Sequence, residues 1–389
     1  MDSKQTDPVD SDLKHKAARR AEEAAEEAVQ RALHPPTGRI ETMVVEQMAM
    51  TPMAMEDITD YRNAPRARNK GVLKHWDMIT IIAQDPIVMD PKANDPKKKI
   101  LRAKVRVPKD RIWPGPRSHR FHVVDYDMTT GDGGFPVDVS AGRSSENWEF
   151  RDAFADASDE DLRTKHGFFA QNVYAIAART LAAFEFALGR RVNWSCDAHQ
   201  LFLVPHAREM KNAYYRREHR GLFFGYFSGP DDSVVETCLS HDIIAHETTH
   251  AVLDGLRRRF LQANDPEQIA FHEALADIVA LLSVFSVDEV IIASLRNAGL
   301  PEVGINAKRT GEAIAASGLT KLGEEFGRRV ERGDDRHTAA LRESLRLDPA
   351  KIRDSWRSGK DEWADPHRRG EVLVAAVLRT LRNIWVGRI

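Results

Sequence analysis

Apolar residues recur at two different spacings along the chain, and each spacing predicts a different kind of element. Between residues 166 and 188 the apolar positions lie three to five residues apart: Phe169, Val173, Ile176, Leu181, Phe184 and Leu188. This spacing predicts a buried amphipathic helix that ends at Gly189. Residues 101–107 instead alternate apolar and basic side chains, and residues 120–127 are β-branched and aromatic. Proline, glycine and aspartate clusters bound these runs, so we expect an antiparallel sheet within residues 71–138.

Two further segments, residues 200–205 and 222–227, also have the composition of strands, whereas the chain beyond residue 241 is mainly helical in pattern. Residues 1–40 are different again, because they are charged and alanine-rich and offer few apolar positions to bury. We interpret them as a charged helical or disordered arm that stops at Pro35 and Pro36, with a docking helix as the alternative.

Composition limits the function classes. The 389 residues include 57 basic and 59 acidic side chains, a net charge of −2, and 42 % are apolar. The near-neutral charge argues against a dedicated nucleic-acid binder, which needs a basic face. The longest apolar run, residues 278–287, is too short for a helix that crosses a bilayer. Cys196 and Cys238 do not form a disulfide framework, and the first residues lack the apolar core of a signal peptide. We expect a cytoplasmic globular protein with no nucleic-acid or membrane partner, and its oligomeric state stays open.

The strongest chemical signal is the pentad His246-Glu247-Thr248-Thr249-His250, which follows an apolar approach. On a helix, side chains four residues apart share a face, so both imidazoles can bind one Zn²⁺ ion. Glu247 would stand beside them, within reach of a water on that ion. A catalytic zinc site has three protein ligands, so the pentad predicts another ligand downstream.

A suitable ligand lies on the next apolar helix. Glu273 and Asp277 are four residues apart in a segment that begins near Phe271. We assign Glu273 as the third metal ligand. Asp277 would accept the second ring N–H of a metal-bound histidine, which fixes the tautomer of that ring. His272, next to the third ligand, is a candidate for a supporting role, although an ordinary structural histidine is the alternative.

Together these segments resemble the paired zinc-binding helices of the thermolysin-like gluzincin metallopeptidases. The resemblance implies an α+β fold with a sheet-rich N-terminal domain over residues 41–240 and a helical catalytic domain over residues 241–389. The active-site cleft would lie between them. It also implies that His246, His250 and Glu273 bind zinc and that Glu247 is the general base. Asn212, Ala213 and Tyr214 are similar to the family's substrate-binding edge strand, which pairs with an extended peptide.

Residues 365–372 resemble the segment that supplies the family's transition-state histidine. The match is to the fungalysin version of that segment, in which the histidine is followed by two residues and then by Gly-Glu-Val. The resemblance makes His367 the candidate that donates to the developing oxyanion, and Asp365 a candidate for orienting it.

Three features depart from the family pattern. Members carry a tyrosine that assists the oxyanion shortly beyond the second histidine ligand, where this chain has Phe260-Leu261-Gln262. Secreted members have signal and pro segments, and we find neither in this sequence. Family members also continue with more helices where this sequence stops at Ile389, so a fragment is one interpretation of it. We therefore expect a zinc metalloendopeptidase. One alternative is a zinc-binding module of the same fold that binds peptides or protein partners without turnover. Another is an enzyme that hydrolyses a non-peptide amide, or an aminopeptidase.

Overall fold

The computed structural model describes residues 76–84, 100–133, 152–196, 198–228, 234–258, 266–297 and 366–386. All of them belong to one compact unit, Lys70–Ile389. The arm expected over residues 1–40 lies outside the described residues. The division into domains at residues 240 and 241 stays a prediction.

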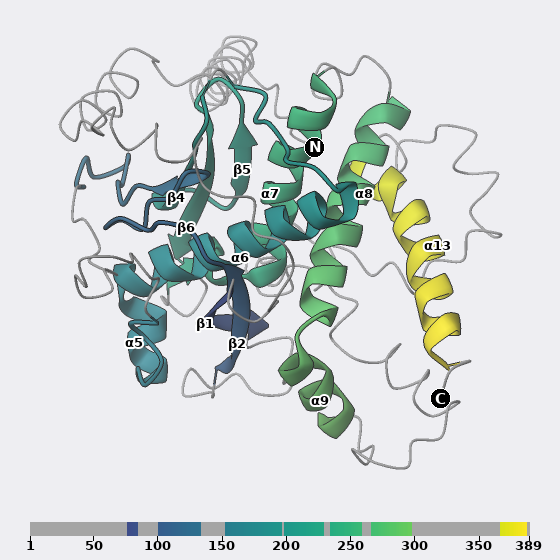
Figure 1. The fold of residues 1–389 in the computed structure, drawn as a ribbon, viewed down its shortest axis with the longest axis horizontal. Helices are drawn as coiled ribbons and strands as arrows, with labels where there is room; N and C mark the ends of the chain where they lie inside the picture. The colour runs from purple at the N-terminus through teal and green to yellow at the C-terminus, as the bar shows by residue number, and fades with distance from the viewer. Residues whose placement is uncertain are drawn as a thin grey trace, which may run out of the picture. The chain divides into compact units, whose positions relative to one another are not determined.

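The described chain mixes helices and strands, as expected for the α+β class (Figure 1). Strands β1 (Trp76–Gln84) and β2 (Leu101–Pro108) form an antiparallel pair. A five-stranded sheet has the order β3-β4-β6-β5, with β7 also paired to β6. Its members are β3 (Phe121–Val123), β4 (Leu201–Glu209), β5 (Ala213–Arg216), β6 (Gly221–Ser228) and β7 (Val234–Glu236).

One expectation about the strands is wrong. Residues 120–127 do not extend the antiparallel sheet, because β3 is short and pairs in parallel with β4 of the other sheet. Its partner is about 80 residues away in sequence, so no local pattern reveals the pairing. Strand β5 pairs antiparallel with β6 at the end of the path β3-β4-β6-β5. The side of β5 away from β6 faces helix α7 (His241–Leu256), because the backbone N–H of Tyr215 in β5 donates to Glu247 of that helix.

The helix expected over residues 166–188 is confirmed as α6 (His166–Leu188), preceded by the short helix α5 (Asp159–Thr164). Gly189 ends α6 with a φ of 63°, a left-handed conformation that glycine adopts without strain. Asn172, fully buried on α6, accepts from the Ile82 N–H of β1 and donates to the carbonyl of Cys238. These bonds fix β1 and the backbone at Cys238 to α6.

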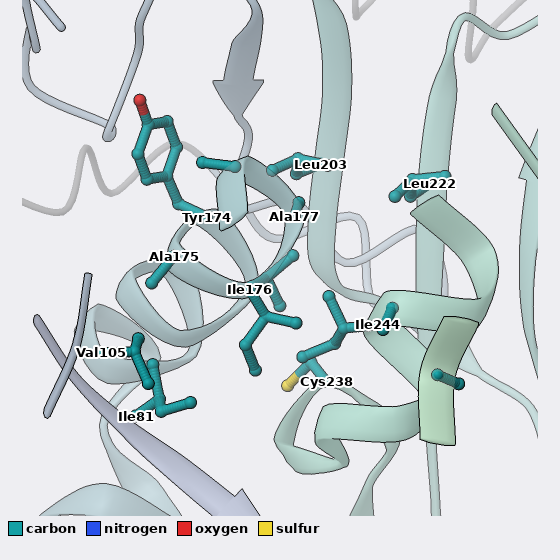
Figure 2. Close-up of a cluster of buried hydrophobic side chains, with 14 of the residues drawn as sticks. Ile81, Val105, Tyr174, Ala175, Ile176, Ala177, Leu203, Leu222, Cys238 and Ile244 are labelled. Atoms are coloured by element: carbon teal, nitrogen blue, oxygen red, sulfur yellow. The ribbon is translucent and has the colours of Figure 1, made fainter. Parts of the chain in front are cut away.

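The core lies between the β1–β2 pair, α6, the larger sheet and α7. Figure 2 shows side chains from each of these elements converging on α6. The labelled members include Ile81, Val105, Tyr174, Ile176, Leu203, Leu222 and Ile244. Burial of this apolar surface is the main source of stability for the unit.

The C-terminal half begins with a short 3₁₀ turn, η2 (Thr237–Leu239), followed by α7 (His241–Leu256) and α8 (Pro266–Phe285). Helix α9 (Asp288–Asn297) follows, and α13 (Pro366–Val386) lies alongside α8 (Figure 1). A Cβ added at Gly370 would lie 2.7 Å from the carbonyl oxygen of Ala270. The absence of a side chain at Gly370 therefore allows α13 to approach α8 closely.

Helix α8 is longer than the apolar run that the sequence suggested. Its 20 residues are long and apolar enough to cross a membrane, yet half of its apolar window is buried and it packs between α7 and α13. These are properties of a core helix. The cytoplasmic location and the absence of membrane and nucleic-acid partners stay predictions from composition.

Candidate metal centre

Helix α7 presents His246 and His250 on one face, as their spacing predicts. The two ring centroids are 4.5 Å apart and the ring planes are nearly perpendicular. Both residues are buried, at 7 % and 9 % exposure. The hydroxyls of Thr248 and Thr249, between them in the pentad, donate to carbonyl oxygens one turn earlier in the same helix. The pentad's hydroxyls are thus satisfied within α7, and its imidazoles are directed at α8.

Glu273 on α8 meets both imidazoles. Its Oε2 atom lies 3.3 Å from Nε2 of His246 and 3.6 Å from Nε2 of His250. Zinc holds histidine nitrogens and carboxylate oxygens at roughly 2.0–2.2 Å, which places neighbouring ligands of a tetrahedral ion about 3.4 Å apart. The two measured separations agree with such an arrangement.

The donor atoms form two overlapping groups among the described residues that can hold a metal ion. One group is His246, Glu247 and His250, and the other is His250, His272 and Glu273. In each group, one donor atom from every residue lies within 4.8 Å of the others. Neither group contains all three predicted ligands, but the groups share His250, and the distances above join Glu273 to both imidazoles.

Asp277 occupies the position expected of a carboxylate that orients a ligand. It is fully buried one turn beyond Glu273, and its Oδ1 lies 2.8 Å from Nδ1 of His246. A hydrogen on Nδ1 directed at this carboxylate leaves the lone pair on Nε2 free for a metal. Asp277 is therefore placed to favour the tautomer that binds a metal through Nε2.

The electrostatics of the site favour metal binding. Burial, followed by the charge of His246, holds the pKa of His250 well below its usual value. Burial alone would raise the pKa of Glu273, but the nearby rings of His250, His246 and His367 outweigh it and lower that pKa. The site therefore offers a neutral imidazole and an ionised carboxylate, which are the forms that bind metals.

Glu247 connects this centre to the sheet. Its Oε2 accepts a hydrogen bond of 2.9 Å from the backbone N–H of Tyr215 on β5. Of the predicted substrate-binding residues, Asn212 is exposed just before β5, while Ala213 and Tyr214 lie in it. The edge strand and the candidate base are therefore neighbours.

His367 approaches the centre from α13. Its Nδ1 lies 3.0 Å from Oε2 of Glu273, and about half of its side chain is exposed. This places His367 beside the predicted third ligand, at the same oxygen that faces both α7 imidazoles. Its predicted role toward an oxyanion stays a prediction, and Asp365 lies outside the described residues.

The structure also adds residues that sequence reasoning undervalued or missed. His272 is 3 % exposed and stacks parallel to His250 with centroids 4.6 Å apart. Within the described part of the chain, its Nε2 and the Nδ1 of His250 are buried without a hydrogen-bond partner. Asp254, one turn beyond His250, is fully buried and gave no sequence signal beyond its place on the helix.

Neither a scan against protein-family models nor a search of curated proteins finds a match for this chain. The resemblance to gluzincins therefore stays an expectation, and the case for a metal centre stands on the geometry described above.

Proposed function

We propose that this protein is a zinc-dependent metallopeptidase that hydrolyses peptide bonds. One observation carries the proposal: two buried imidazole nitrogens lie 3.3 and 3.6 Å from a single carboxylate oxygen, beside a glutamate bonded to an edge strand. Each part of this arrangement has a use in peptide hydrolysis.

The donor set favours zinc among common metals. Two imidazoles and one carboxylate are a ligand set of catalytic zinc, whereas magnesium and calcium favour sites made of oxygen atoms alone. Three protein ligands leave a coordination position for water or substrate. Zinc bound by His246, His250 and Glu273 would polarise a peptide carbonyl and make water nucleophilic near neutral pH.

The chain's own residues would supply the remaining steps. Glu247 is the candidate general base, and the Tyr215 N–H donates to one of its oxygens, which orients the carboxylate beside the candidate metal ligands. After taking the proton, Glu247 would pass it to the leaving amine. The backbone of Asn212 and Ala213, at the start of β5, would align an extended peptide as an added strand.

Replacement of the base tests this proposal. The Glu247→Gln variant should bind one equivalent of zinc, measured by metal analysis, and lose cleavage of an unfolded protein substrate. Loss of a general base alone removes about 10²- to 10⁴-fold in rate. Glu289→Gln, an exposed substitution of the same type on α9, is the matched control and should keep full activity. Normal cleavage by Glu247→Gln would refute the role of Glu247.

A second candidate function is a zinc-binding module that binds peptides without cleaving them. The contact between His367 and Glu273 favours it, because a histidine on the third ligand is close enough to act as a further ligand and close the site. This candidate predicts zinc-loaded protein that binds an extended peptide in a fluorescence anisotropy titration yet cleaves no member of a peptide library.

A further inference from the structure

The buried carboxylate of Asp254 joins helix α7 to the edge strand. Its Oδ2 accepts from the hydroxyl of Tyr215 and from Nε of Arg217, each at 2.8 Å, and its Oδ1 accepts from the outer guanidinium nitrogen of Arg217. Tyr215 lies in β5 and Arg217 directly follows it. An ionised carboxylate inside a protein is costly unless it is paired and hydrogen-bonded, and these donors provide that compensation.

The same arginine also holds the end of the helix. Its outer guanidinium nitrogen donates to the carbonyl of Arg258, 2.6 Å away and just beyond the last residue of α7. Hydrogen bonding to Asp254 raises the pKa of Arg217, and burial followed by the bond to Asp254 raises the pKa of Tyr215. Both side chains therefore stay protonated, and remain donors, throughout the physiological range.

Tyr215 makes a second bond to α7, through its backbone. Its N–H donates to Glu247, seven residues before Asp254 on the same helix. Seven residues are two turns, so the two carboxylates lie on one face about 10 Å apart along the axis. A strand held at two such points cannot slide along α7 or rotate away from it without breaking a buried bond.

We propose that Tyr215, Asp254 and Arg217 form a positioning clamp that fixes the edge strand against α7 and so aligns the substrate backbone and Glu247 with the metal ligands. These three are positioning residues, since they act through Glu247 and the strand. The inference rests on the proposed peptidase function for its catalytic consequence. Its structural part, the fixed strand, does not depend on that function.

Loss of the clamp should affect the chemical step more than substrate binding. A peptide would still pair with β5, but its scissile bond would be displaced from the metal and the base. Misplacement of about 1 Å costs on the order of 10²-fold in rate. We expect Tyr215→Phe to lower kcat about 10- to 100-fold, to change KM less than about 3-fold and to keep zinc affinity. Arg217→Lys keeps the charge without the two-pronged geometry and should fall between this variant and the wild type.

A matched control is available in the same sheet. The hydroxyl of Tyr226 on β6 donates to Asp127 over 2.7 Å, a bond of the same type between residues that make no contact with the metal centre. Tyr226→Phe should leave kcat and KM unchanged. An equal fall in kcat in the two variants would show a general effect of losing a tyrosine–aspartate bond and would overturn the clamp.

Hydrogen exchange at the Tyr215 amide tests the clamp without any activity assay. We expect exchange at least about 10-fold faster in Tyr215→Phe and Asp254→Asn than in the wild type, and unchanged in Tyr226→Phe. If Asp254→Asn does not fold, Tyr215→Phe and Arg217→Lys carry the test.

The outcomes separate the two proposals. Unchanged exchange in the Tyr215 and Arg217 variants overturns the clamp. Faster exchange with an unchanged kcat overturns its catalytic role. Faster exchange in a chain whose zinc-loaded wild type cleaves no peptide supports the fixed strand and refutes the peptidase function alone.

Discussion

A methyl group at Gly370 should separate His367 from the metal centre. The Cβ of Gly370→Ala would lie 2.7 Å from the carbonyl oxygen of Ala270 and 3.3 Å from the Cβ of Ala274 on α8. Ordinary contact between carbon and oxygen needs roughly 3.5 Å, so α13 must move outward by about 0.7–0.8 Å. His367 lies one turn earlier on α13, only 3.0 Å from Glu273. A rigid shift would extend that separation to about 3.7 Å, beyond hydrogen-bond range.

The free energy of unfolding should fall moderately at most. Overpacking of a tight helix contact costs about 1–3 kcal/mol, whereas replacing glycine by alanine within a helix gains about 1 kcal/mol in propensity. The net loss is therefore about 0–2 kcal/mol. Activity should fall by at least about 10-fold, because a single donor to a developing oxyanion contributes about 10²- to 10³-fold.

Urea unfolding and peptidase assays on the same preparation measure the two effects separately. Ala376→Gly, on the exposed face of α13, is the control, since it loses helix propensity without approaching α8. It should be less stable by about 1 kcal/mol and fully active. A folded Gly370→Ala variant with wild-type activity would refute a catalytic role for His367 at this position.

Two other variants examine supporting residues. Asp277→Asn should weaken zinc binding about 10- to 100-fold in a competition with a chromophoric chelator, because the carboxylate no longer orients His246. Asp288→Asn, an exposed substitution on α9, should bind zinc as the wild type does. Equal affinities in the two variants would contradict the orienting role of Asp277. Burial, with the nearby charge of Arg179, lowers the pKa of His241 from 6.5 to about 3, so the unfolded chain binds the extra proton as the pH falls below 6.5. The free energy of unfolding in urea should therefore decrease by about 2 kcal/mol between pH 7 and pH 5. His241→Asn should lose about that much pH dependence. An identical pH dependence in the variant would contradict the assignment of this effect to His241.

The sequence predicted those parts of the site that share one helix or follow a helical period. His246 and His250 share a face of α7, and Glu273 and Asp277 share a face of α8, because each pair is four residues apart. The helix before them was also predictable, since its apolar positions and Gly189 are local signals. Local patterns were sufficient wherever the element itself sets the geometry.

Contacts between distant elements were not predictable in this way. The pairing of β3 with β4 and the bonds of Asp254 to Tyr215 and Arg217 join segments 37 to 80 residues apart. His241 shows the same limit, because its place at the start of α7 does not reveal that its ring bridges Ala83 of β1 and Ser283 of α8. A buried polar residue becomes informative only when the tertiary structure supplies its partner.

Competition with a chelator measures how tightly the protein binds zinc and which side chains hold the ion. Wild-type protein should bind one equivalent tightly, and Glu273→Gln, His246→Ala and His250→Ala should each lose most of that affinity. His199→Ala, an exposed histidine, should bind as the wild type does. Undiminished affinity in Glu273→Gln would contradict the account, because the two imidazoles of α7 would then hold the metal without the carboxylate of α8.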